Sequence, residues 1–262
     1  MKRRNLYILI TIVITSYLLT ACTRGSATEN LAPSFTADEI AASKASAEQL
    51  FKQRSDLGKL RQAIKAIAKL RNPDKRDFDV EWTFARYNYF LGRHSTDESE
   101  SEKAFSIGRD AAKIALNVDP NRPDGHFWYG ANLGELCKKS PVTVGLRYVG
   151  EVRESMKRVV ELDPGYQGAS AFDVLGQIEL ATRIKDGSVE KAVEYLEKGL
   201  EFERQNSSLR LHLAEAYRAM RKDAEAKEQL EAILKMPPSP DYVPEHQETI
   251  ATARKLLETK FK

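Results

Sequence analysis

A short motif, Asp-Pro at the end of a segment with helical apolar periodicity, recurs along the chain and constrains its fold more than any other feature. One apolar-periodic segment ends on Asn117-Val118-Asp119-Pro120, and a later one ends on Val160-Glu161-Leu162-Asp163-Pro164. Proline ends a helix because it lacks the backbone N–H donor and its ring clashes with the preceding turn. Between these phrases the apolar residues recur at helical spacing, and no stretch alternates like a strand. The chain is therefore predicted to be all-α and to repeat a helix-turn-helix unit.

Helix pairs with small residues at the crossing point and proline at the end are typical of tetratricopeptide repeats, whose period is about 34 residues. We interpret the sequence as about five such hairpins in a solenoid. The pair that fits best carries its key residues at the standard spacings: Leu213, Ala214, Tyr217, Ala226, Leu230, Ile233 and Pro238. A last helix from about Pro244 to Lys260 is predicted to cap the array. Residues 37–262 are thus predicted to form one tetratricopeptide-repeat domain.

Two of the central pairs are longer than the standard unit. We assign the extra residues to connections between helices, one a polar loop at residues 92–97 and the other an insertion at residues 138–145. Longer connections in repeat arrays tend to lie on one face, which is often the binding face. The sequence therefore predicts a functional surface near the centre of the array.

The first residues carry a targeting signal rather than part of the fold. Lys2, Arg3 and Arg4 precede an apolar stretch at residues 6–19 that is short for a membrane span, and Leu19-Thr20-Ala21-Cys22 follows. This pattern fits a bacterial lipoprotein signal peptide at residues 1–21, with Cys22 lipidated. The alternative is an ordinary signal peptide with a chance cysteine.

The residues around the predicted cleavage site indicate a location in the cell envelope. Residues 22–36 are expected to form the lipidated cysteine and a flexible tether, because they are small and polar. Thr23, rather than Asp, follows Cys22. In a cell with two membranes, this favours attachment to the outer membrane at its periplasmic face.

Cleavage would change the charge of the chain. Three of the 41 Lys and Arg residues lie within residues 1–21, and none of the 38 Asp and Glu residues does, which leaves 38 of each sign. A mature chain with no net charge gives no overall reason to expect binding to nucleic acid.

The sequence gives little support for catalysis. The glycine-rich segment at residues 145–150 is followed by Glu151 rather than by the lysine of a phosphate-binding loop. The four histidines show no metal-ligand spacing, and Cys137 has no partner other than the lipidated Cys22. We therefore expect no enzyme, no metal and no cofactor, and we expect Cys137 to be a small buried residue.

The first helix of each repeat normally faces the concave side of the array, and here these helices are rich in aromatic residues. An apolar groove with a few polar groups is typical of a ligand site. The alternative is that these aromatic residues form core between stacked hairpins. The predicted groove residues are Arg86, Tyr87, Phe90, His126, Phe127, Asn132, Tyr148 and Phe172.

Four segments resemble the T component associated with tripartite ATP-independent periplasmic (TRAP) transporters, the TatT family: residues 84–92, 119–132, 172–176 and 237–242. The most specific of these phrases is Gly125-His126-Phe127-Trp128-Tyr129-Gly130-Ala131, which related eukaryotic microtubule-associated proteins share in part. The resemblance covers roughly residues 37–260. Residues 180–187 depart from the family pattern, since they lack its proline and paired glycines.

The resemblance implies a periplasmic lipoprotein with a tetratricopeptide fold. It also implies a homotrimer around a pore, contact with the substrate-binding P component of the transporter, and transfer of a hydrophobic small molecule. The first functional hypothesis is therefore an accessory of TRAP-type solute uptake. The alternative is a scaffold lipoprotein for envelope or pilus assembly that has no small-molecule site.

Overall fold

The structure is a computed structural model that describes residues 35–239 and 242–261. The predicted signal peptide, the lipidated Cys22 and the tether as far as residue 34 lie outside the described residues. Phe35–Lys262 cluster as one compact unit. No helix in the described part of the chain is both long and apolar enough to cross a membrane.

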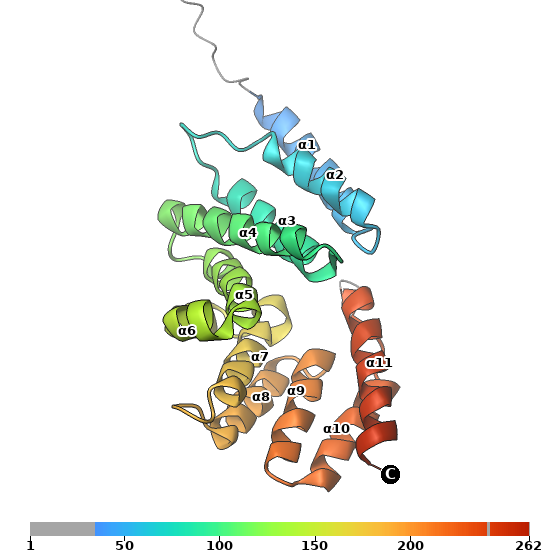
Figure 1. The fold of residues 1–262 in the computed structure, drawn as a ribbon. Helices are drawn as coiled ribbons and strands as arrows, with labels where there is room; N and C mark the ends of the chain where they lie inside the picture. The colour runs from blue at the N-terminus through green and yellow to red at the C-terminus, as the bar shows by residue number, and fades with distance from the viewer. Residues whose placement is uncertain (1–34, 240–241, 262) are drawn as a thin grey trace, which may run out of the picture. The chain divides into compact units, whose positions relative to one another are not determined.

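The described residues fold into helices joined by short connections, and none of them forms a strand. Successive helices pack against each other as hairpins, and the last helix packs on the final hairpin (Figure 1). The helices are α1 (Ala37–Phe51), α2 (Leu57–Ala68), α3 (Phe78–His94), α4 (Glu98–Val118), α5 (Pro123–Lys139), α6 (Leu146–Leu162), α7 (Tyr166–Ala181), α8 (Val189–Phe202), α9 (Ser207–Ala219), α10 (Asp223–Lys235) and α11 (Val243–Lys260). The prediction of five hairpins and a C-terminal helix is confirmed.

Small residues let the helices of a hairpin approach closely. A Cβ atom on Gly176 of α7 would lie 2.6 Å from Cγ of Leu196 on α8, nearer than real Cβ atoms come to such a neighbour. Leu196 is fully buried there, as are Leu60, Met156 and Leu230 in other hairpins. Burial of each such side chain contributes roughly 1.5–3 kcal/mol to folding. The regular occurrence of small and large residues therefore sets the hairpin packing.

Polar caps fix where several helices begin. At the start of α1, the amide of Glu39 donates to Oγ1 of Thr36 at 3.2 Å, and the amide of Thr36 donates to Oε2 of Glu39 at 2.8 Å. This capping box satisfies donors that the first turn of a helix leaves free. At the starts of α2, α3 and α4, the carboxylates of Asp56, Asp77 and Asp97 accept hydrogen bonds from backbone amides of the first turn, without a reciprocal bond. Each cap contributes about 1 kcal/mol.

The prediction of a polar loop at residues 92–97 is wrong for its first half, because residues 92–94 are helical. The helix α3 continues to His94 and α4 begins at Glu98, which leaves a three-residue turn. Gly92 faces the ring of Phe105 so closely that a Cβ atom would lie 2.6 Å from it, and Oγ of Ser101 donates to the carbonyl of Gly92 at 2.7 Å. These contacts extend the helix pairing, so the extra residues lengthen α3 and α4.

The insertion at residues 138–145 is also more helical than predicted. The helix α5 continues to Lys139, a π-helical turn spans Pro141–Gly145, and α6 follows directly. Pro141 is suited to the first position of this turn, where no backbone N–H is required. The turn leaves the side chain of Val142 exposed, and Leu146 at the start of α6 is exposed as well.

Candidate functional site

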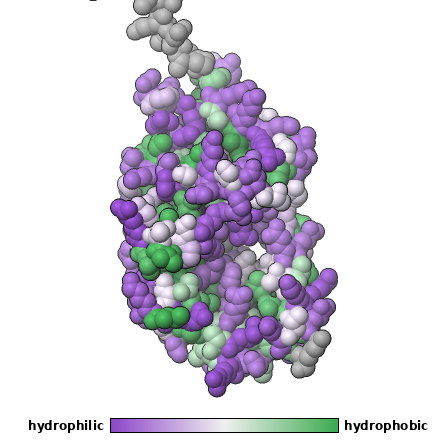
Figure 2. All heavy atoms as spheres, viewed as in Figure 1, coloured by the Kyte–Doolittle hydropathy of each residue, from purple (hydrophilic) through white to green (hydrophobic). Residues whose placement is uncertain are grey.

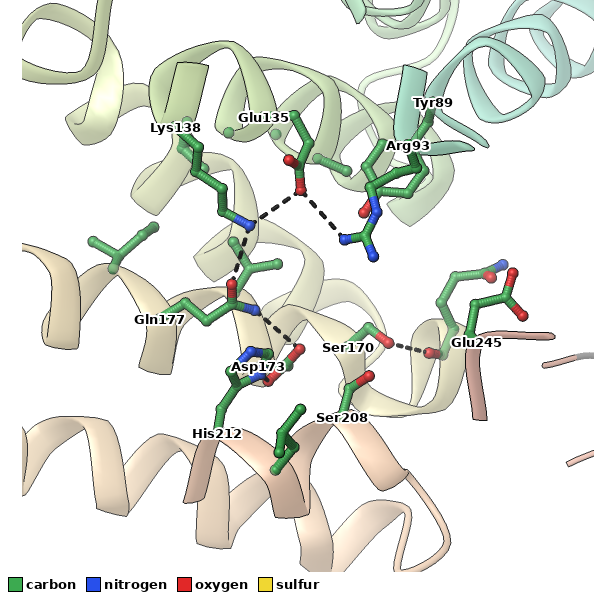
Figure 3. A pocket seen from close by; sticks show the side chains of 18 of the residues that line it. Tyr89, Arg93, Glu135, Lys138, Ser170, Asp173, Gln177, Ser208, His212 and Glu245 are labelled. Atoms are coloured by element: carbon green, nitrogen blue, oxygen red, sulfur yellow. Dashed lines mark hydrogen bonds and ion pairs between the residues drawn. The ribbon is translucent and has the colours of Figure 1, made fainter. Parts of the chain in front are cut away.

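The first helices of the second to fifth hairpins and the C-terminal helix surround a cavity of about 630 Å³. Figure 3 shows its polar side chains, which come from α3, α5, α7, α9 and α11. Small-molecule sites in proteins commonly have volumes of about 300–1,000 Å³. The cavity is therefore large enough for a metabolite-sized ligand.

One face of α5 forms part of the cavity lining. Phe127, Ala131, Gly134 and Lys138 recur there at the spacing of successive helical turns. A Cβ atom on Gly134 would meet only Cγ1 of Val152, at 3.6 Å, which is an ordinary contact. Packing therefore does not require glycine at this position. The missing side chain instead leaves space in the cavity.

Aromatic side chains from α3 and α5 form an apolar wall. The rings of Phe127 and Trp128 lie 4.9 Å apart edge to face, and the rings of Tyr89 and Phe90 lie 5.4 Å apart in a similar arrangement. The ring of Tyr89 also lies 5.5 Å from that of Trp128, which joins the two helices. Burial and the nearby carboxylate of Glu135 raise the pKa of Tyr89, so its hydroxyl stays protonated.

Charged and amide side chains from successive repeats form a second wall, which we call the polar chain: Arg93, Glu135, Lys138, Gln177, Asp173 and His212 (Figure 3). The ammonium group of Lys138 donates to Oε1 of Glu135 and to Oε1 of Gln177, at 3.1 Å in each case. Nη1 of Arg93 lies 3.7 Å from the same carboxylate of Glu135. This half of the chain therefore links α3, α5 and α7.

The other half of the polar chain links α7 to α9. Nε2 of Gln177 donates to Oδ2 of Asp173 at 3.1 Å, and Nδ1 of His212 lies 2.6 Å from Oδ1 of Asp173. An ionised carboxylate accepts hydrogen bonds and cannot donate them, so Nδ1 of His212 carries the proton. Burial by itself lowers the pKa of His212, but the charge of Asp173 and its hydrogen bond outweigh burial and raise the pKa overall.

A left-handed turn at the start of α7 lies beside the cavity. Gln167, Gly168 and Ala169 all have positive φ, at 51°, 64° and 60°. This conformation costs roughly 1–2 kcal/mol for a residue with a Cβ atom. Nδ2 of Asn206 donates to the carbonyl of Gly168 at 2.6 Å, and the hydroxyl of Tyr242 donates to Oε1 of Gln167 at 2.6 Å. Contacts from α9 and from the approach to α11 therefore hold the turn.

The N-terminal half of α11 closes another side of the cavity. Glu245 accepts from Nε of Arg54 at 3.0 Å and from Nη2 at 2.8 Å, and the side chain of Arg54 is 6% exposed. The guanidinium carbon of Arg54 also lies 5.0 Å from the ring centre of Phe90. Glu248 lies 3.8 Å from Arg93 and 3.5 Å from His94. Ion pairs thus join α11 to the first two hairpins.

The structure places two of the eight predicted groove residues in the cavity lining. Phe90 and Phe127 form part of the aromatic wall. Tyr148 lies on α6 under the guanidinium of Arg147, and Phe172 is buried in the core against the ring of Phe202. Neither Tyr148 nor Phe172 lines the cavity.

The other four predicted residues make structural contacts outside the cavity lining. Arg86 and Tyr87 both bind the carboxylate of Glu48, with the hydroxyl of Tyr87 donating at 2.9 Å. Nε2 of His126 lies 2.9 Å from the carbonyl of Pro120, in the turn before α5. The amide of Asn132 is fully buried and donates to the carbonyl of Trp128 at 2.7 Å.

Sequence reasoning missed the polar chain, although a local signal for it exists. Asp173 and Gln177 lie one helical turn apart on α7, and Glu135 and Lys138 lie nearly one turn apart on α5. Each pair shares a helix face with residues that line the cavity. Charged residues on the concave face of a first helix are the pattern that would have indicated the site. Among the residues that the structure describes, no group of three or more His, Cys, Asp and Glu side chains could hold a metal ion.

The sequence matches two family profiles. The profile described as regulator of microtubule dynamics protein 1-3 matches residues 44–179, which is more than half of the chain. A tetratricopeptide-repeat profile matches residues 183–243. Among curated proteins, no sequence matches the chain significantly.

Solved structures with a similar fold include several bacterial proteins. A thermophilic tetratricopeptide protein of Thermus thermophilus is 18% identical with a TM-score of 0.62, covering 83% of this chain and 100% of its own. The protein pilF of Pseudomonas aeruginosa is 19% identical with a TM-score of 0.55, covering 84% and 93%. MamA of Desulfovibrio magneticus RS-1 is 14% identical with a TM-score of 0.53, covering 76% and 94%.

At these identities the structural likeness establishes the fold alone, which is a tetratricopeptide solenoid. The match of the longer profile covers α2 to α6 completely, and it includes about half of α1 and nearly all of α7. The chain belongs to the family described as regulator of microtubule dynamics protein 1-3, and its repeats are tetratricopeptide repeats.

Proposed function

We propose that this protein is a non-catalytic binding module that holds a small amphipathic molecule in its cavity. The observation that carries the proposal is the pairing of an aromatic wall with the polar chain across one cavity of about 630 Å³. An apolar body would pack on Phe90 and Phe127, and a polar group would meet Lys138 or His212. Apolar pockets with a few convergent polar groups are the usual form of a ligand site.

The site of action that we propose is the bacterial cell envelope. The lipoprotein-type sequence that ends in Cys22 supports a lipid anchor and a periplasmic location, with the outer membrane as the favoured membrane. The family's description names regulators of microtubule dynamics. An envelope lipoprotein has no access to microtubules, so we do not extend that role to this chain.

The partner that we propose is the periplasmic substrate-binding component of a TRAP-type transporter. This part of the proposal comes from the resemblance to the TatT family, as does a homotrimeric assembly. In this role the protein would hold a hydrophobic solute close to the transporter. The role requires a cavity that accepts the solute and a surface that contacts the binding component.

A scaffold for envelope or pilus assembly, without a small-molecule site, is the second candidate. The observation that favours it is the internal pairing of the polar chain. Glu135, Asp173 and Lys138 are each bound to neighbouring side chains, as a cavity without a ligand would require. The two candidates differ in whether the cavity retains a small molecule.

Native mass spectrometry of the chain from residue 23 onward, purified from its host, tests the ligand. We expect the wild-type protein to carry added small-molecule mass. The variant Gly134→Leu should lose at least about ten-fold in ligand occupancy, because the new side chain fills the cavity. The matched control is Gly150→Leu on α6, where a Cβ atom would meet no other atom within 4 Å.

Wild-type protein that carries no added mass in any preparation would contradict a cavity ligand and favour the scaffold. Equal occupancy in the Gly134→Leu variant would contradict the cavity as its location. Crosslinking in intact envelopes tests the partner separately. Recovery of a TRAP-type binding component supports that part of the proposal, and its absence refutes the partner without affecting the ligand.

A further inference from the structure

Large apolar side chains are exposed at the rim of the cavity. Leu146 at the start of α6 is 61% exposed, and Ile184 in the α7–α8 connection is 94% exposed, yet both also line the cavity. Val142, one turn before Leu146, is 76% exposed. Figure 2 shows apolar side chains on the side of the molecule where α6 and the α7–α8 connection lie. We call Val142, Leu146 and Ile184 the rim patch.

Positive charge accompanies the rim patch. Arg147 follows Leu146 directly, and Arg183 and Lys185 flank Ile184. All three basic residues are exposed. The guanidinium carbon of Arg147 lies 5.3 Å from the ring centre of Tyr148, and Nη1 of Arg183 donates to the carbonyl of Leu180 at 2.7 Å. Asp186 is the one acidic residue in the connection at residues 182–188. The α7–α8 connection therefore carries one more positive than negative charge, although the chain from residue 22 onward would have no net charge.

The composition of this surface favours a lipid bilayer over a folded protein partner. Protein interfaces are enriched in aromatic residues at their centres. The rim patch instead presents three aliphatic side chains on two separate turns. Aliphatic side chains can enter the hydrocarbon boundary of a bilayer while arginine and lysine contact anionic headgroups.

We propose that the rim patch and its three basic residues dock on an anionic phospholipid surface, with the mouth of the cavity toward the bilayer. This contact is separate from the lipid on Cys22 and does not depend on the identity of a cavity ligand. The proposed occupant is the bilayer. Its anionic headgroups complement the charges of Arg147, Arg183 and Lys185, and its hydrocarbon boundary can accept the exposed aliphatic side chains beside them.

Cosedimentation with vesicles tests the proposal in the chain from residue 23 onward, which lacks Cys22 and therefore carries no lipid anchor. The vesicles are pure phosphatidylcholine, or phosphatidylcholine with about 30% phosphatidylglycerol. We expect binding to the anionic vesicles and little binding to the neutral ones. The double variant Leu146→Ser/Ile184→Ser should lower the partition coefficient about ten-fold.

Charge reversal tests the electrostatic contribution to vesicle binding. The variant Arg183→Glu/Lys185→Glu should reduce binding to anionic vesicles to the level of neutral vesicles, and added salt should weaken wild-type binding. Matched controls are Val118→Ser/Leu234→Ser, which remove exposed apolar residues from α4 and α10, and Lys227→Glu/Lys235→Glu on α10. Both controls should bind as the wild type does.

Three results would overturn the proposal. The first is equal binding of the wild type to neutral and anionic vesicles. The second is a loss of vesicle binding in the matched controls as large as the loss in the rim-patch variants. The third is no vesicle binding by wild-type protein whose circular dichroism shows a folded chain. A crosslink from Ile184→Cys to a soluble protein, together with that third result, would assign the rim patch to a protein partner instead.

Discussion

Nδ1 of His212 on α9 donates to Oδ1 of Asp173 on α7 at 2.6 Å, where the polar chain ends. The side chains of both residues are largely buried, so solvent screens this ion pair less than it would a surface pair. The contact joins the fourth hairpin to the fifth. It is stronger when both ring nitrogens of His212 are protonated, because the ring then carries a positive charge beside the carboxylate of Asp173.

The first prediction concerns the pH dependence of this contact. The pKa of His212 is raised in the folded protein, so its contribution to stability is fully present below the unfolded pKa of about 6.5. It is lost as the pH rises through the folded pKa. Urea unfolding should show wild type more stable than His212→Gln by about 1–3 kcal/mol near pH 6, with a smaller difference near pH 9. A difference that grows with pH would contradict this assignment.

The second prediction compares two glycines on helices. Gly176→Ala should lower the free energy of unfolding by about 1–3 kcal/mol, because the new methyl group would overlap Leu196. Gly150→Ala should raise it by up to about 1 kcal/mol, because nothing lies within 4 Å and alanine favours the helix. Urea denaturation midpoints measure both effects. Similar midpoints for the two variants would refute the close α7–α8 contact.

The third prediction concerns the contact between α11 and the first hairpin. Arg54→Met should cost about 3 kcal/mol, because it leaves the partly buried carboxylate of Glu245 without this partner. Hydrogen exchange should increase most in α11. The control is Arg61→Met, whose pair with Glu100 is more exposed and should cost less than about 1 kcal/mol. Unchanged exchange in α11 would show that the ion pair does not hold this helix.

The fourth prediction separates two roles of Asn206. Oδ1 accepts from the amides of Ser208 and Leu209 as the cap of α9, while Nδ2 donates to the carbonyl of Gly168. Asn206→Asp keeps the cap and loses the donor, so it should cost about 1 kcal/mol. Asn206→Ala loses both and should cost about 2 kcal/mol. Equal costs in thermal or urea unfolding would show that the bond to Gly168 contributes little.

The hairpins could be predicted from the sequence because their signals are local. Proline at positions 120 and 164 ends helices, and glycine or alanine recurs where two neighbouring helices cross. The end of α3 was misassigned for a physical reason. His94 precedes the polar residues Ser95, Thr96 and Asp97, which are typical of a loop, but the contact of Gly92 with Phe105 extends the helix. That contact depends on packing between helices, which polarity alone does not reveal.

The cavity was less predictable than the hairpins. Lys138 and Gln177 meet although 39 positions separate them, and the same separation holds for Asp173 and His212. Helical periodicity identifies the face on which a residue lies, but it does not identify the residue opposite. Aromatic content therefore indicated Phe90 and Phe127, which line the cavity. It indicated Tyr87 equally, although Tyr87 is buried in the core, where its hydroxyl donates to Glu48.

The ion pair between Arg54 and Glu245 also has a consequence for the order of folding. Repeat arrays form mainly through contacts between neighbouring units, so most of this chain can fold as it leaves the ribosome. Arg54 and Glu245 are 191 positions apart, so their contact can form only by closing a long loop, which costs chain entropy. The side of the cavity that α11 supplies therefore forms after nearly all of the chain has been synthesised. A truncated product would retain stable hairpins and lack the side of the cavity that α11 supplies.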